Sequence, residues 1–362
     1  MALKTMSDVK IHLKLSKMQL TNYKQSVAVL TSGNDDKAHI DVFGISDDVS
    51  TKFDETTSVY KLVEKAFEVP DFRGVVEVIS APQNDVAKTA NASATPTSSG
   101  ASVSTSDTNR YVYALSQAVN DGFNYVVTDN LAEKDLEAVS DYLYNTQNAL
   151  LVAQLNSVEA FNNLQAYSSQ NQPMTSTKLN PVYAIVQTDG HLPNIQVATY
   201  ATMNAPIDLM KIGNLSEFVE DPNLAQEDID AINAKNGSVV IDKADDMMML
   251  SGMTFGSNWA DEFINTKIVK DAFQYDLQKL LNNNKHMHLD DAGINLLYQN
   301  AKMTAQRLYS EGYLDTQTDV NKKSFAETSD IEKSTRTYNG LSIEATVMSS
   351  IESINVTLDL VE

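Results

Sequence analysis

The sequence predicts a layered α/β (α+β) protein with mixed sheets and helices and a β-strand arm at each end. Three observations support this prediction: strict apolar–polar alternation near both termini, apolar runs that alternate with amphipathic stretches in between, and two long amphipathic helices late in the chain. With 362 residues, 42% of them hydrophobic, the chain is long enough to bury the cores of about two domains.

The first arm is predicted at residues 9–15, where apolar and polar residues alternate strictly. One face of this strand carries Val9, Ile11, Leu13 and Leu15, and the other carries Lys10, His12 and Lys14. The second arm, residues 353–360, has the same pattern. Its apolar face consists of Ile354, Val356, Leu358 and Leu360, and Asp359 lies on the polar side.

The two arms have opposite charges. Residues 1–24 contain five lysines and one acidic residue, Asp8, for a net charge of +4, whereas residues 341–362 contain four acidic residues and no Lys or Arg, for a net charge of −4. Opposite charges favour pairing one kind of arm with the other over pairing either with itself. Two arrangements remain open: pairing inside one subunit, and exchange of strands between subunits.

We expect the chain to divide into four segments. They are an N-terminal arm at 1–20, an α/β domain at 21–200, a second domain at 201–340 that contains both long helices, and a C-terminal arm at 341–362. Residues 81–110 consist largely of Ala, Ser, Thr and Asn and have almost no large apolar side chains, so they predict a long exposed loop within the first domain.

Strands and helices alternate in the middle of the chain, which is typical of a layered α/β domain. We expect helices near 59–67, 111–119, 132–144 and 226–233, strands near 75–79, 123–128, 149–155, 182–186 and 239–241, an extended segment at 207–212, and either a helix or a strand at 195–200. The clearest helix follows Trp259 and runs to the asparagines at 282–284. A second runs from about 290 to 310, with Gly312 placed as the C′ residue.

Composition excludes several function classes. The chain has 27 basic and 48 acidic residues, a formal net charge of −21, so most of its surface should repel nucleic acid and anionic lipid. It contains no cysteine, which excludes a disulfide framework, a thiolate metal site and a cysteine nucleophile, and is compatible with assembly in a reducing cytoplasm. No apolar run approaches the ~18 residues of a membrane span, so membrane insertion is not expected.

No specific catalytic motif is present: the sequence lacks a P-loop, a GxGxxG fingerprint, a GxSxG elbow and an HExxH pair. His286 and His288 precede Asp290 and Asp291 and could form a metal site, but a loop leading into a helix that an aspartate caps explains them better. The neighbouring acids Asp245 and Asp246 are expected by chance in so acidic a chain. We therefore predict no enzyme and assign no catalytic, cofactor or metal site.

The ordered set of segments resembles the contractile-tail sheath proteins of bacteriophages, especially their short group. The likeness is carried by the N-terminal strand, residues 44–80, 121–143, 251–281 and 288–315, and the final strand. It spans most of the chain and is weakest at 81–110 and about 320–340. Many sheath proteins have large extra domains, so this chain resembles a near-minimal sheath.

The resemblance implies a structural subunit without a cofactor. Such subunits form six-fold rings stacked helically around a tail tube, exchange arm strands with neighbours, and contract to drive the tube through the host envelope. The implied partners are copies of the same chain, the tube protein, and baseplate and terminator proteins, within a virion tail assembled in the bacterial cytoplasm. The late helix is implied to face the tube, and its candidate residues are Asp290, Asp291, Asn295, Gln299, Lys302 and Gln306.

Two alternatives stay open at this point. Another tail or baseplate component belongs to the same structural class, although tube proteins are usually smaller and richer in β-structure. A hydrolase that uses acidic residues, with or without a metal near His286, belongs to a different class and requires carboxylates that converge in a concave site.

Overall fold

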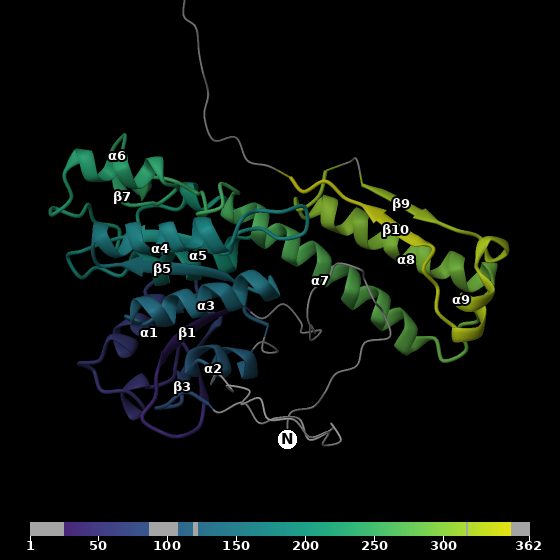
Figure 1. Cartoon of the computed structure of the whole chain (residues 1–362), viewed down its shortest axis with the longest axis horizontal. Coiled ribbons are helices and arrows are strands. Elements are labelled where there is room, and N and C mark those ends of the chain that lie inside the picture. The colour runs from purple at the N-terminus through teal and green to yellow at the C-terminus, as the bar shows by residue number, and fades with distance from the viewer. Residues whose placement is uncertain (1–24, 87–107, 119–121, 316–317, 349–362) are drawn as a thin grey trace, which may run out of the picture. The chain divides into compact units, whose positions relative to one another are not determined.

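The computed structural model describes residues 25–86, 108–118, 122–315 and 318–348, and both predicted arm strands lie outside these ranges (Figure 1). The chain divides into two compact units, the first reaching Lys267 and the second beginning at Ile268. Mixed helices and sheets confirm the predicted fold class. No helix among the described residues is long and apolar enough to cross a membrane.

The first unit is built on a six-stranded sheet with the order β2-β3-β1-β4-β5-β6. Five strands are parallel, and β2 pairs antiparallel to β3 at one edge. The strands are β1 (Ser26–Ser32), β2 (His39–Gly44), β3 (Val75–Ala81), β4 (Tyr125–Thr128), β5 (Leu150–Leu155) and β6 (Val182–Val186). Apart from edge strand β2, these strands are short, almost continuous apolar runs, as expected of a parallel sheet covered on both faces.

Helices cover both faces of this sheet. The helices are α1 (Ser58–Phe67), α2 (Arg110–Ala118), α3 (Glu133–Thr146), α4 (Val158–Asn171), α5 (Pro193–Asn204) and α6 (Gln226–Ala234). One core cluster joins α2, α3, α4 and α6 to alternate strand residues such as Ala28 and Leu30. Helices α1 and α5 pack against each other and the opposite face, where Val27 and Val29 lie fully buried.

The first unit also contains two 3₁₀ turns and a β-hairpin. They are the 3₁₀ turns η1 (Val49–Thr51) and η2 (Leu209–Lys211) and the hairpin of β7 (Val240–Lys243) and β8 (Asp246–Met249). The extended segment expected at 207–212 is thus interrupted by a 3₁₀ turn, because Asp208 caps it by accepting from the Met210 N–H at 2.9 Å. The open choice at 195–200 is resolved as helix.

Helix α7 (Ala260–Asn283) starts in the first unit and ends in the second. The second unit continues with α8 (Asp291–Ser310), the strands β9 (Asp319–Lys322) and β10 (Leu341–Glu344), the 3₁₀ turn η3 (Phe325–Glu327) and the short helix α9 (Asp330–Thr335). Strands β9 and β10 pair antiparallel, and β9 packs along α8 (Figure 1). Gly312 has a φ of +82° just after α8, so the predicted C′ glycine is confirmed.

Candidate functional site

Helix α8 carries the predicted tube-facing residues. Its first residue follows Asp290, whose Oδ1 accepts the Gly293 N–H at 2.8 Å and thereby caps the helix. Asp291 lies in the first turn and its Oδ1 accepts the N–H of Phe325 at 2.8 Å, which connects η3 to the helix start. Both aspartates therefore have structural roles at the place where the sequence also allowed a metal.

One stripe of α8 is buried and contacts α7. The stripe consists of Gly293, Ile294, Ala301, Thr304, Ala305 and Leu308. Asp276 on α7 accepts hydrogen bonds from Thr304 Oγ1 at 2.7 Å and from the Arg307 guanidinium at 3.0 Å. Burial alone would lower the pKa of Arg307, but its bonds to Asp276 and Glu311 raise it above the ordinary value. The guanidinium therefore stays charged and holds the two helices together.

The opposite stripe of α8 is exposed. All six predicted residues lie on it or at the helix start and are exposed. The stripe also carries apolar residues that the sequence analysis missed: Leu296 is 49% exposed, Met303 71% and Tyr309 43%. The sequence did contain a sign of this apolar patch. Leu296 and Met303 are seven residues apart, which places them on one face of a helix, and neither belongs to the core stripe. Methionine and tyrosine are enriched at protein–protein interfaces, so the exposed Met303 and Tyr309 make this face suited to protein contacts.

A lysine–aromatic cluster fixes β9 against this helix. The ammonium of Lys302 lies 5.1 Å from the ring centroid of Tyr298, and that of Lys322 on β9 lies 5.0 Å from it. Lys322 also donates to Asn295 Oδ1. Each cation–π contact contributes roughly 0.5–1 kcal/mol at an exposed site. Strand β9 and α8 therefore lie side by side in the second unit.

The two hydrolase candidates are not supported by the geometry. His286 and His288 are exposed, and among the described residues no group of three or more His, Cys, Asp or Glu side chains could hold a metal ion. Asp245 and Asp246 lie at the turn of the β7–β8 hairpin. The Asp245 N–H donates to Asp242 Oδ1 at 2.8 Å, and Asp246 Oδ1 accepts from Asn214 Nδ2 at 2.7 Å. Both acids thus contribute to the loop structure.

A buried acid pair, missed at the sequence level, lies at the start of α7. Asp261 is 8% exposed and Asp208 2% exposed. The pKa of Asp261 is raised to about 6, mainly because the carboxyl group is buried and secondly because the charge of Asp208 is close by. A carboxyl group with such a pKa could act as a general acid, but a substrate cannot reach a group so deeply buried. The pair therefore affects stability rather than chemistry.

We expect Asp261→Asn to stabilise the first unit above pH 7. The raised pKa means that the folded state loses stability as the pH rises from the unfolded pKa near 3.8 to above 6, because a buried carboxylate must then form. The amide removes this cost, so the variant should gain up to about 3 kcal/mol at pH 8 and almost nothing at pH 4. Urea unfolding at both pH values measures the difference. An equal gain at both would contradict the argument.

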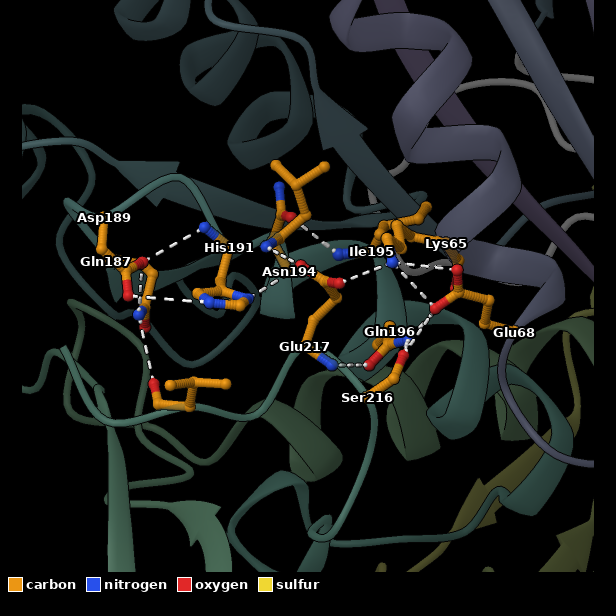
Figure 2. A network of polar contacts seen from close by, with 12 residues as sticks. Lys65, Glu68, Gln187, Asp189, His191, Asn194, Ile195, Gln196, Ser216 and Glu217 are labelled. Atoms are coloured by element: carbon orange, nitrogen blue, oxygen red, sulfur yellow. Dashed lines mark hydrogen bonds and ion pairs between the residues drawn. The ribbon is translucent and has the colours of Figure 1, made fainter.

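A polar network braces α1 and α5 at the carboxyl end of β6 (Figure 2). Glu217 is at its centre: Oε1 lies 2.9 Å from the Lys65 ammonium, and Oε2 accepts from the Leu192 N–H at 2.8 Å. His191 Nδ1 lies 3.3 Å from the same Oε2. Burial would raise the pKa of Glu217, but Lys65 and the Leu192 N–H lower it below its usual range.

The network closes through a glutamine on α5. Gln196 Oε1 accepts the Glu217 N–H at 2.9 Å, and its Nε2 donates to Ser216 Oγ at 2.7 Å. Ser216 Oγ donates in turn to Glu68, the C-cap residue of α1, at 2.7 Å. Because both oxygens of Glu217 are occupied, this cluster of histidine, lysine and glutamate holds helices in place and is not arranged as an acid–base site.

Known proteins resemble this chain in structure but not detectably in sequence. No protein-family model and no characterised protein sequence matches the chain. Three cryo-EM structures match nearly all of it. The contracted helical sheath of the anti-feeding prophage (AFP) has a TM-score of 0.59 at 12% identity, with 99% of both chains covered. A chain of the six-fold symmetrised AFP baseplate has a TM-score of 0.59 at 13% identity, covering 99% of this chain and 98% of that one.

The third match is the contracted sheath complex of PVC, an extracellular contractile injection system. It has a TM-score of 0.60 at 10% identity and covers 99% of this chain and 98% of that one. This chain has the fold of contractile-sheath subunits. The resemblance inferred from the ordered segments is therefore confirmed at the level of the fold. The sheath fold includes both the six-stranded unit and the unit that carries α8, because the coverage is nearly complete.

Proposed function

We propose that this protein is the structural subunit of a phage contractile tail sheath. It polymerises as stacked six-fold rings around a tail tube and contracts to drive the tube through the host envelope. The observation that supports this most strongly is the structural match to two contracted sheaths, each covering 99% of this chain.

The proposed role is non-enzymatic. A contractile sheath needs two arrangements of the same subunits that differ in free energy, and rigid-body movement between them requires no covalent chemistry. The features described above agree with this role, since the Glu217 network holds helices of the first unit in place and the α8 face is suited to protein contacts.

The proposed partners follow from that role. The chain assembles with copies of itself, its α8 face contacts the tube, and the ends of the polymer contact baseplate and terminator proteins. We place it in the virion tail, assembled in the bacterial cytoplasm. The predicted segments 1–20, 21–200, 201–340 and 341–362 remain our assignment of arms and functional domains, and the arms are proposed to exchange strands between neighbours.

Negative-stain electron microscopy of the purified protein tests the proposal directly. Tubular polymers with an axial channel and six-fold cross-sections are expected at high protein concentration. Compact monomers under every condition of salt and concentration would contradict a sheath subunit. Short rings or discs without stacking would instead favour a baseplate component.

Replacing Lys10 and Lys14 by glutamate should weaken polymerisation. The N-terminal segment carries +4 and the C-terminal segment −4, so the reversal replaces attraction between exchanged arms by repulsion. We expect about a tenfold higher concentration for half-maximal polymer, measured by sedimentation. Introducing Asp359→Lys and Glu362→Lys in the same chain should partly restore it. A complete lack of rescue would remove the support for charge-guided arm pairing.

A further inference from the structure

The sequence contains two Asn-Gly dipeptides, Asn236-Gly237 in the first unit and Asn339-Gly340 in the second. Asparagine is prone to lose its side-chain amide, and most of all before glycine, because glycine has no Cβ to hinder the reaction. The glycine nitrogen must reach the carboxamide carbon of the asparagine. The structure around each pair therefore decides whether the reaction proceeds.

The fold holds Asn236 and Gly237 in place. Asn236 has a φ of +61°, and its Nδ2 donates to Ser257 Oγ at 2.9 Å. The Gly237 N–H donates to the Ile232 carbonyl at 2.9 Å. A Cβ at Gly237 would lie 2.4 Å from the ring of Phe161, so the dipeptide packs directly against the core. A reaction at this pair would first have to break both hydrogen bonds.

Asn339 and Gly340 are held less tightly. Asn339 is exposed and lies two residues before β10. Its backbone N–H donates to Glu332 Oε1 at 3.1 Å, and its carboxamide lies beside the same carboxylate. The Gly340 carbonyl accepts the Lys323 N–H at 2.9 Å, but within the described parts of the chain no residue accepts the Gly340 N–H. The attacking nitrogen can therefore lose its proton without breaking a hydrogen bond.

We propose that Asn339 is a deamidation site and that the fold protects Asn236 from the same reaction. The deprotonated Gly340 nitrogen attacks Cγ of Asn339, and the side-chain nitrogen leaves as ammonia, which closes a succinimide ring. Water then opens this ring. Opening at the former side-chain carbonyl yields aspartate, and opening at the main-chain carbonyl yields isoaspartate, in which the main chain runs through the former side chain.

Either product changes the region where β10 begins. The new carboxylate lies beside Glu332, whose pKa is lowered to about 2, mainly by hydrogen bonds from Ser329 and then by the one from Asn339. Ser329 and Glu332 form the capping box of α9, so repulsion between two neighbouring carboxylates weakens that cap. Isoaspartate also lengthens the main chain before Gly340, whose bond to Lys323 continues the pairing of β10 with β9. We expect modified protein to pair these strands less stably.

Peptide mass spectrometry of the full chain measures both sites in one experiment. The protein is incubated at mildly alkaline pH, which favours the deprotonated nitrogen, in its folded state and in guanidinium chloride. In the folded chain we expect Asn236 to react at least about tenfold more slowly than Asn339, because its two hydrogen bonds must open first. In guanidinium chloride the two sites should react at similar rates, since the fold then holds neither.

The comparison between the two states decides the proposal. Equal rates at the two sites in the folded chain would overturn it, because the fold would then not distinguish them. An unmodified Asn339 in the folded chain, with both sites reacting in denaturant, would also overturn it, because the fold would then protect both. A lack of reaction at both sites in denaturant would show that neither dipeptide is reactive and would overturn it as well.

Asn339→Gln is the matched control. Glutamine keeps the amide, but its longer side chain must close a larger ring, so this peptide should stay unmodified. Incubated wild-type protein should unfold at a lower temperature than the Asn339→Gln chain incubated in parallel, whereas the two fresh proteins should unfold alike. Identical unfolding after wild-type Asn339 has reacted would contradict the expected effect on the pairing of β9 with β10.

Discussion

Deleting residues 1–16 is expected to yield a folded monomer that no longer forms tubes. The arm is too small to hold a fixed conformation by itself: burying its four aliphatic side chains contributes at most ~6–12 kcal/mol, and fixing seven backbone residues costs ~7–14 kcal/mol. These values nearly cancel, so we expect the arm to need hydrogen bonds from another sheet to hold a fixed conformation. Its removal should therefore abolish assembly and leave the core of the first unit unchanged.

Sedimentation and electron microscopy measure the loss, and circular dichroism with thermal unfolding confirms that the monomer is folded. A deletion of residues 1–8 is the matched control, because it shortens the chain but keeps the alternating strand at 9–15. We expect this control to polymerise. Tubes formed by the longer deletion would show that contacts outside the N-terminal arm are sufficient to hold the copies together.

The distribution of charge gives a second reason to expect that the arms are needed for assembly. Residues 25–267 contain 13 basic and 33 acidic residues, a net charge of −20, while residues 1–24 carry +4. Copies of so acidic a unit repel each other at low ionic strength. The basic arm is the one long segment of opposite charge, and in a polymer it would act both as a strand and as a counter-charge.

Periodicity predicted the elements with strong local patterns. Both long helices, α7 and α8, were found because apolar residues recur at helical spacing over many turns, and the strands β3 to β6 were found as compact apolar runs. The cap at Asp290 and the glycine at 312 were also identified correctly. Each of these features depends on residues that are close together in the sequence, so it can be predicted without knowing the fold.

The missed elements depend on residues far apart in the sequence. Strand β1 is a central strand of the sheet, but its apolar run is short and fits either a helix or a strand. Helix α4 buries few large apolar residues, because polar side chains such as Ser168 lie on its inner face and bond to Gln172 at 3.0 Å and to Asn180 at 2.8 Å. Strands β9 and β10 have only four residues each and are largely exposed, so the alternation within β10 is too brief to distinguish it from a loop.

The candidate interface was predicted in part. The polar residues of α8 were named as tube-facing from the family resemblance, and the structure shows that they are exposed. The apolar residues on that face were missed, because Leu and Met within a helix are usually assigned to the core. The buried pair of Asp208 and Asp261 was also not predictable, because the two acids lie 53 positions apart and meet only in the folded unit.

Replacing both Leu296 and Met303 by aspartate should abolish binding to the tube without preventing self-assembly. The two side chains are 49% and 71% exposed on the face of α8 that we assign to the tube, and burying them there would contribute about 2–4 kcal/mol. We therefore expect at least about thirtyfold weaker co-sedimentation with the co-expressed tube protein. Tubes of the variant alone should still form, because its arms are unchanged.

Ile331→Asp is the matched control for this double variant. Ile331 is 75% exposed and belongs to the same unit, but it lies on α9 and not on α8. The control should bind the tube as wild type does, and both proteins should unfold at similar temperatures, since an exposed aspartate costs a helix only about 0.5 kcal/mol. Tube binding that survives in the α8 variant, or is lost equally in the control, would show that another surface of the subunit faces the tube.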